Sequence, residues 1–96
     1  MDIKNLKLYK FYADWCGPCK VQTKMFGETP LKVEIISVNV EEDSELVNKF
    51  GIRGVPTLIL ADDEDTIIKS WNKLTNPNVI NEFIDELRLQ GRDSQD

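Results

Sequence analysis

Residues 15–19 read Trp-Cys-Gly-Pro-Cys, and they contain the only two cysteines of the chain, Cys16 and Cys19. An alternating apolar segment at residues 5–12 precedes them and predicts a strand. A helix is expected to begin around Gly17–Pro18, because the fixed φ of proline suits a first helical turn. The sequence therefore places two thiols one helical turn apart, close enough to cycle between a dithiol and a disulfide.

The position of Cys16 at the start of this helix explains the reactivity that we expect of it. The thiolate is the nucleophile, and a free cysteine with a pKa of about 8.5 is mostly protonated at neutral pH. At a helix N-terminus, unpaired backbone N–H groups and the helix dipole favour an anion. We therefore expect Cys16 to be an exposed attacking thiol with a lowered pKa, and Cys19 to resolve a mixed disulfide.

Composition limits the partners that the chain can have. It has 96 residues, 41% of them hydrophobic, and a formal net charge of −5. We expect no binding to nucleic acid, which needs a basic patch, and no membrane span, because no apolar run is long enough. We expect a monomer with one domain at residues 1–91 and a flexible polar tail at residues 92–96. With no export signal evident, the expected location is cytoplasmic.

The chain contains no histidine, which narrows its chemistry further. Ser-His and Cys-His activation of a nucleophile are excluded, and the commonest metal ligand is missing. A structural zinc site normally needs four Cys or His ligands, so two cysteines leave only zinc shared between chains as an alternative. We therefore expect redox chemistry and no metal.

Strand and helix patterns alternate along the chain. We predict strands at residues 5–12, 33–40, 57–61 and 66–71, and helices at residues 17–26, 44–50 and 77–91, the last ended by Gly91. The acidic run Asp62–Asp65 is expected to be a solvated turn. The order βαβαββα predicts an α/β fold in which three helices flank a four-stranded mixed sheet.

A second segment, Gly51-Ile52-Arg53-Gly54-Val55-Pro56-Thr57, enters the third predicted strand. Proline is awkward there, because it lacks the N–H that a strand ladder uses. One reading is an ordinary trans proline on an edge strand. The other is a cis Val55–Pro56 bond, which would turn the chain sharply and leave the Val55 backbone free to pair with an extended peptide.

Together these segments resemble the thioredoxin family. Residues 11–20 look like that family's active-site block, residues 51–57 look like its cis-proline loop, and the resemblance covers roughly residues 6–89. A lone C-x-x-C beside a βαβ pattern is typical of thioredoxin-like redox proteins. The resemblance implies a thioredoxin fold in minimal form, without the extra N-terminal strand and helix of typical members.

The resemblance also implies roles for individual residues. Cys16 would be the nucleophile and Cys19 the resolving thiol of a protein-disulfide reductase. Trp15 would flank the site, the alternative being a core aromatic. The other implied site residues are Gly17 and Pro18 as support, and Gly54, Val55 and Pro56 as the edge that binds the substrate backbone. Implied partners are disulfide-containing proteins and thioredoxin reductase as electron donor, with no cofactor beyond the Cys16–Cys19 disulfide.

One departure from the family touches the mechanism. The family usually has a buried aspartate where this chain has Lys10, and a paired lysine where it has Ser37. As an ammonium, Lys10 would stabilise thiolates, and as a desolvated amine it could accept a proton. We favour a third interpretation, in which its stem packs while its head reaches solvent.

Two other functions fit parts of the sequence. A glutaredoxin-like reductase recharged by glutathione is favoured by the short N-terminal region, whereas Trp-Cys-Gly-Pro-Cys favours a thioredoxin-like reductase. A non-catalytic module could use the same groove to hold a partner protein as a subunit. Our first choice is the thioredoxin-like protein-disulfide reductase.

Overall fold

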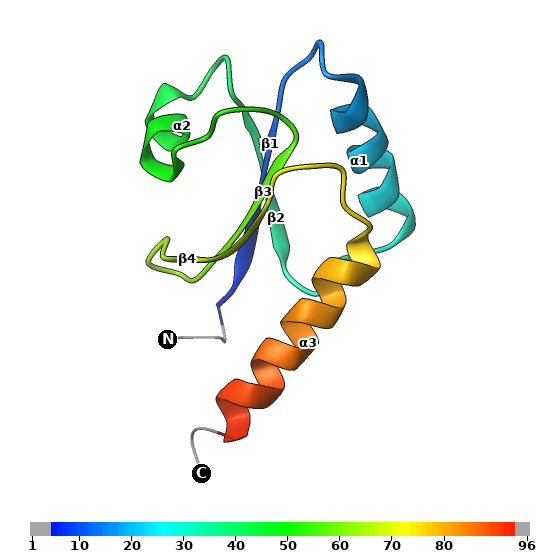
Figure 1. Ribbon diagram of the computed structural model, residues 1–96, viewed down its shortest axis with the longest axis vertical. Coiled ribbons are helices and arrows are strands. Elements are labelled where there is room, and N and C mark those ends of the chain that lie inside the picture. Colours follow the sequence, from blue (N-terminus) through cyan, green and yellow to red (C-terminus); the bar gives the residue numbers. More distant parts are fainter. Residues whose placement is uncertain (1–4, 94–96) are drawn as a thin grey trace.

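The computed structural model describes residues 5–93, and it contains four strands and three helices in the predicted order (Figure 1). The strands are β1 (Lys7–Tyr12), β2 (Glu34–Asn39), β3 (Thr57–Ala61) and β4 (Ile67–Trp71). The helices are α1 (Gly17–Glu28), α2 (Ser44–Phe50) and α3 (Pro77–Asp93). No helix within the described residues is long and apolar enough to cross a membrane.

The four strands form one mixed sheet in the order β2-β1-β3-β4. β1 pairs in parallel with β2, whereas the β1–β3 and β3–β4 pairs are antiparallel. The predicted fold class is confirmed. Because β1 lies inside the sheet, its side chains are covered by neighbouring strands as well as by helices.

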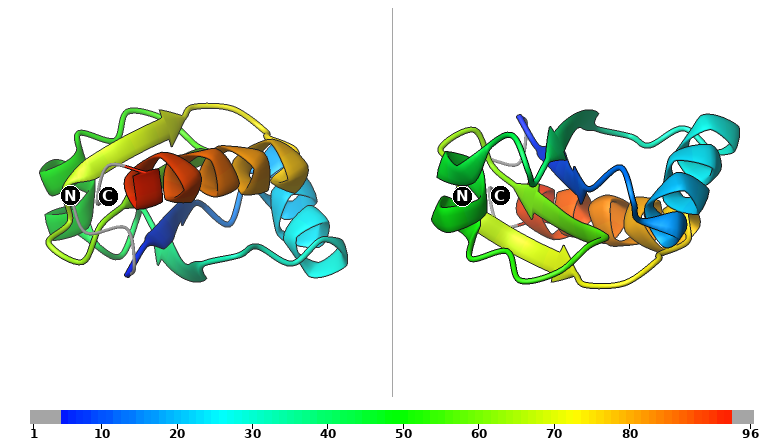
Figure 2. Two further views of the ribbon diagram at one scale, coloured as in Figure 1. Left: turned by 90° about the horizontal axis from the view of Figure 1, so that it is seen from below. Right: turned by 90° about the horizontal axis from the view of Figure 1, so that it is seen from above.

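Helices cover both faces of this sheet (Figure 2). α1 and α3 pack on one face, where the buried cluster consists of Leu6, Leu8, Phe26, Leu58, Leu60, Ile80 and Ile84. α2 packs on the other face, where the buried cluster consists of Tyr9, Phe11, Val38, Phe50, Ile59 and Ala61. Successive strand residues point to opposite faces, so Lys10 lies on the same side of β1 as Leu8 and faces α1.

Two helices end later than predicted. α1 continues through Gly27 to Glu28, and the Thr29 N–H closes it on the Met25 carbonyl at 2.8 Å. α3 continues through Gly91 to Asp93. A glycine inside a helix costs only about 1 kcal/mol relative to alanine, so it need not end one. Part of the predicted polar tail is therefore helical, and residues 94–96 lie outside the described residues.

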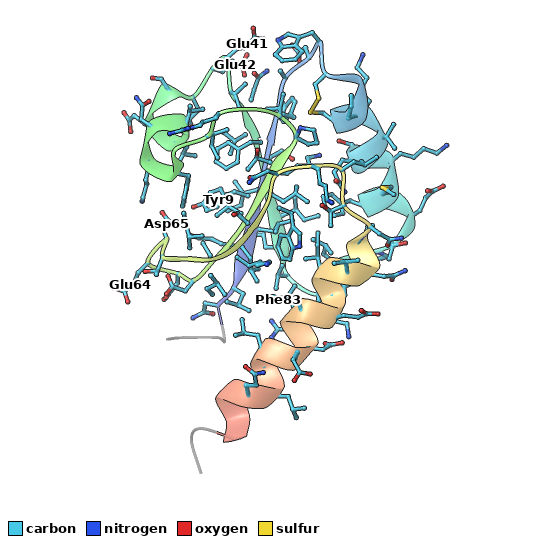
Figure 3. All side chains as sticks on the ribbon, in the orientation of Figure 1. Tyr9, Glu41, Glu42, Glu64, Asp65 and Phe83 are labelled. Atoms are coloured by element: carbon cyan, nitrogen blue, oxygen red, sulfur yellow. A yellow bond between two sulfur atoms is a disulfide. The ribbon has the colours of Figure 1, made fainter. Side chains whose placement is uncertain are left out.

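The turn between β3 and β4 is only partly the solvated acidic run that we expected, because Asp63 and Glu64 are exposed and the acidic residues on either side of them are not. Asp62 is buried, and its Oδ1 accepts the N–H groups of Glu64 and Thr66, each at 2.9 Å. Asp65 has a positive φ of 62° and accepts a 2.6 Å hydrogen bond from the hydroxyl of Tyr9. Figure 3 shows the side chains of Tyr9 and Asp65 pointing toward one another. Buried polar groups need partners, and these carboxylates supply them.

Candidate active site

Cys16 and Cys19 form a disulfide at the N-terminal end of α1 (Figure 3). Their Cα atoms lie 5.3 Å apart, within the usual range for a disulfide. Cys16 is the N-cap of α1, and its Sγ accepts the backbone N–H of Cys19 at 3.1 Å. The structure thus confirms that Cys16 lies at a helix N-terminus, where a backbone donor already points at its sulfur.

The prediction that Cys16 is exposed is wrong for this disulfide form. Cys16 is 3% exposed and Cys19 is 4% exposed. Together with Ala13 they form a small buried cluster, against which Tyr12, Val40 and Val55 pack. The next two residues, Gly17 and Pro18, are exposed and form the first turn of α1. Access to the sulfur atoms is therefore limited by the apolar side chains around them.

Trp15 lies at the surface beside the disulfide, with 70% of its area exposed, so the core position is excluded. It lines a cavity of about 270 Å³ together with Gly54 and Val55, and the exposed Arg53 also lines it. Two segments that are far apart in the sequence, the cysteine motif and the residues before β3, therefore face the same cavity.

The Val55–Pro56 peptide bond is cis, and the trans reading is wrong. Val55 packs against the cysteine cluster, while the Thr57 hydroxyl donates to the Gly54 carbonyl at 2.7 Å. Pro56 is buried. The loop that the sequence singled out thus lies next to the disulfide.

Comparisons with known proteins agree with this geometry. A family model described as thioredoxin matches residues 1–86. The chain belongs to the thioredoxin family. It is 33% identical over 84 residues to a thioredoxin of Rickettsia felis, which covers 80% of each chain. It is also 33% identical over 68 residues to a thioredoxin of Bacillus subtilis, covering 67% of this chain and 65% of that one.

Solved thioredoxin structures are similar in shape. A mutant thioredoxin of Halobacterium salinarum superposes with a TM-score of 0.75 at 28% identity, covering 85% of this chain and 74% of that one. A thioredoxin of Malassezia sympodialis gives a TM-score of 0.71 at 29% identity, with the same coverage of 85% and 74%. The fold and the cysteine pair together identify this chain as a thiol–disulfide oxidoreductase of the protein-disulfide reductase kind.

The redox centre of a thioredoxin is the disulfide itself, and the family uses no further cofactor. Among the described residues, no group of three or more His, Cys, Asp or Glu side chains is placed to hold a metal ion.

Lys10 lies on the sheet face that α1 covers, and it is more buried than the interpretation of a head that reaches solvent predicts. The residue is only 8% exposed, because β1 lies between two strands and α1 covers this face. Its Nζ donates to Thr23 Oγ1 at 2.8 Å. The Thr23 hydroxyl in turn donates to the Cys19 carbonyl at 3.1 Å. Burial lowers the pKa of Lys10.

Sequence reasoning missed Gln22 and Thr23 of α1. Gln22 is fully buried and makes two 2.8 Å hydrogen bonds with the backbone of Thr75, one to its carbonyl and one from its N–H. These bonds tie the active-site helix to the segment before α3. The available signal was helical spacing, since Gln22 lies three residues after Cys19 and four before Phe26, on the buried face of α1.

Proposed function

We propose that Cys16 is the attacking thiolate and Cys19 the resolving thiol in the reduction of protein disulfides. The observation that carries this proposal is the N–H of Cys19, which donates to Cys16 Sγ at 3.1 Å at the start of α1. A donor in this position stabilises a thiolate on Cys16 in the reduced protein. The sulfur of Cys19 receives no equivalent help from the helix N-terminus, because it lies a turn further along.

The reaction uses two exchange steps. The Cys16 thiolate attacks one sulfur of a substrate disulfide, which forms a mixed disulfide and releases the other substrate sulfur as a thiolate. Cys19, as a thiolate, then attacks Cys16 Sγ, forms the Cys16–Cys19 bond and releases the second substrate sulfur. Two electrons pass to the substrate, and two protons end on its sulfur atoms. The oxidised protein then needs an external reductant.

We assign the substrate edge to the loop that faces the disulfide. Val55, which precedes the cis Pro56, packs against the cysteine cluster, and Gly54 and Val55 line the same cavity as Trp15. An extended peptide in that cavity would pair with the backbone of Val55 and lie against the exposed indole of Trp15. Gly17 and Pro18 would support the site by forming the first turn of α1.

We assign thioredoxin reductase as the electron donor and a cytoplasmic monomer as the working form. The family membership supports the donor, since reductases of this kind recharge thioredoxins. A glutathione-recharged reductase is the competing assignment, and the two differ in the source of electrons rather than in the residues that carry them.

Insulin reduction distinguishes these assignments. We expect turnover with thioredoxin reductase and NADPH, and none with glutathione and glutathione reductase; turnover with glutathione alone would overturn the assigned donor. Cys16→Ser is expected to abolish turnover. Cys19→Ser is expected to trap substrates as mixed disulfides on Cys16. A protein with both cysteines replaced by serine that kept its biological function would instead support a partner-binding module.

A further inference from the structure

Lys10 is a buried amine with neutral neighbours. Within the sheet it lies between Ser37 of β2 and Leu58 of β3. Toward α1 its Nζ meets the hydroxyl of Thr23, and the ring of Tyr12 lies with its centre 5.9 Å from Nζ. Among the described residues, no carboxylate is hydrogen-bonded or ion-paired to this amine, and burial alone accounts for its lowered pKa.

The amine is linked to Cys19 through one side chain. Thr23 Oγ1 accepts from Lys10 Nζ at 2.8 Å and donates to the Cys19 carbonyl at 3.1 Å. Cys19 and Thr23 also line a cavity of about 270 Å³, whose other walls include the exposed, oppositely charged Asp14 and Lys20. Lys20 and Thr23 are exposed, so this side of α1 reaches the surface next to Cys19.

A buried lysine without a counter-ion is unfavourable in the disulfide form, in which neither sulfur can ionise. An isolated buried charge is costly, and the group loses its proton more readily instead. Reduction changes this balance, because it creates a thiol on Cys19, the residue whose backbone carbonyl Thr23 connects to the amine. A thiolate on Cys19 would be the counter-charge that the disulfide form lacks.

We propose that Lys10 is a positioning residue for the proton of Cys19: the amine on β1 and the resolving thiol on α1 share one proton, which lies on Lys10 when Cys19 attacks. The inference rests on the proposed roles of Cys16 and Cys19. It reverses the sign of the charge beneath the cysteines relative to the carboxylate that the family resemblance leads one to expect. Lys10 thereby favours the thiolate rather than the thiol.

Each proton and each bond in the resolving step can be accounted for. The Cys19 thiol gives its proton to the Lys10 amine, which becomes an ammonium. The Cys19 thiolate attacks Cys16 Sγ in the mixed disulfide; the Cys16–Cys19 bond forms, and the bond from Cys16 to the substrate sulfur breaks. The substrate leaves as a thiolate and takes up a proton from solvent, while the ammonium of Lys10 releases its proton to solvent.

An equilibrium consequence follows from the same geometry. A cation beside the cysteines stabilises the reduced, partly ionised pair and has no thiolate to act on in the disulfide form. Lys10 therefore makes the protein easier to reduce and a weaker reductant. A tenfold loss of this stabilisation would make the reduction potential about 30 mV more negative.

The test measures Cys19 alone. In a Cys16→Ser background, the thiolate absorbance of the reduced protein is followed against pH with Lys10 intact and with Lys10→Met. We expect Lys10→Met to raise the pKa of Cys19 by about one unit. The control is Lys24→Met, an exposed lysine on the same helix as Cys19, which should leave that pKa unchanged. Because Lys10 and Cys19 titrate together, the unaltered protein should show two coupled steps.

A second measurement uses the cysteine pair. Lys10→Met with both cysteines present should have a more negative reduction potential, and Thr23→Val should shift it in the same direction by less. If Lys10→Met does not fold, Thr23→Val carries both measurements. An unchanged Cys19 pKa and potential in a folded variant would overturn the inference. Insulin turnover of the protein with Lys10 intact reports separately on the proposed function, because loss of that turnover in Cys16→Ser tests the cysteines without altering Lys10.

Discussion

Lys7 and Lys10 lie on the same strand, yet their surroundings move their pKa values in opposite directions. Lys7 Nζ lies 2.9 Å from Asp65 Oδ1, and this hydrogen bond, followed by that with Tyr9, raises its pKa. Lys10 has a hydroxyl as partner, and burial lowers its pKa. The difference is whether a carboxylate balances the amine. A paired lysine contributes to stability, whereas an unpaired buried lysine is available to exchange a proton.

The contacts that hold β1 to its neighbours therefore differ between the surroundings of Lys7 and those of Lys10. Around Asp65, two lysines and the hydroxyl of Tyr9 converge on one carboxylate, so charge joins the β3–β4 turn to β1 and α2. Around Lys10, the contacts described for α1 are hydrogen bonds to uncharged acceptors and apolar packing. Substitutions that remove the charged contacts should therefore cause a loss of stability that depends on salt and pH. Substitutions that remove the uncharged contacts should cause a loss that does not.

The largest loss of stability is expected for Gln22→Leu, which removes the neutral clamp on α1. The N–H and carbonyl of Thr75 would lose their partner in a buried position, at a cost of about 1 to 3 kcal/mol. Because no charge is involved, the loss should be the same at low and high salt and across neutral pH. Urea unfolding at several salt concentrations measures it. Gln90→Leu, at an exposed position of α3, is the control, and a strongly salt-dependent loss would contradict the comparison.

A loss of about 1 to 2 kcal/mol is expected for Asp65→Asn, which keeps the side-chain shape and tolerates the positive φ but removes the charge. Hydrogen bonds from Lys49, Tyr9 and Lys7, in that order, hold the pKa of Asp65 well below its usual 3.8. A carboxylate with a depressed pKa stabilises the fold above its unfolded pKa, and this stability is lost as the pH falls. As the pH is lowered from 4, the stability of the variant should therefore decrease less than that of the unaltered protein.

Asp63→Asn is the matched control, because Asp63 lies in the same turn and is exposed. It should leave unchanged both the stability at neutral pH and the decrease in stability as the pH falls below 4. The loss caused by Asp65→Asn should shrink as salt is added, in contrast to the loss caused by Gln22→Leu. If stability decreased equally with falling pH in the two asparagine variants, the Asp65 cluster would not stabilise the fold.

The two lysines themselves should give opposite alkaline slopes in the disulfide form. The raised pKa of Lys7 adds stability that is present below 10.5 and lost as the pH rises through the folded value. The lowered pKa of Lys10 means that stability increases as the pH rises toward 10.5. Lys10→Met should therefore be more stable at neutral pH, by about 1.4 kcal/mol for each unit of lowering. Lys7→Met should be less stable there, and urea unfolding at neutral and alkaline pH compares them.

The fold was predictable from the sequence because its signals are local. Alternation predicted the strands, the helix predicted at residues 44–50 is α2 with the same bounds, and the two motifs of the site have their own spacing in the sequence. The fate of Lys10 was not predictable, because its burial depends on which strands flank β1 and on the helix that covers it. Asp65 was missed for a similar reason: a partner such as Tyr9, 56 residues away, leaves no local pattern.

The smallest loss of stability is expected for Lys49→Met. This variant tests whether the exposure of an ion pair matters more for stability than its short N–O distance. Lys49 Nζ lies 2.7 Å from Asp65 Oδ2 and contributes most to the lowered pKa of that carboxyl. Yet its side chain is 51% exposed, against 21% for Lys7, so water and salt screen the pair. We expect a loss of about 0.5 kcal/mol that disappears at high salt, and a larger loss for Lys7→Met. If Lys49→Met cost more, the short exposed bond would be the principal contact of the cluster, and burial would not decide which lysine stabilises the fold.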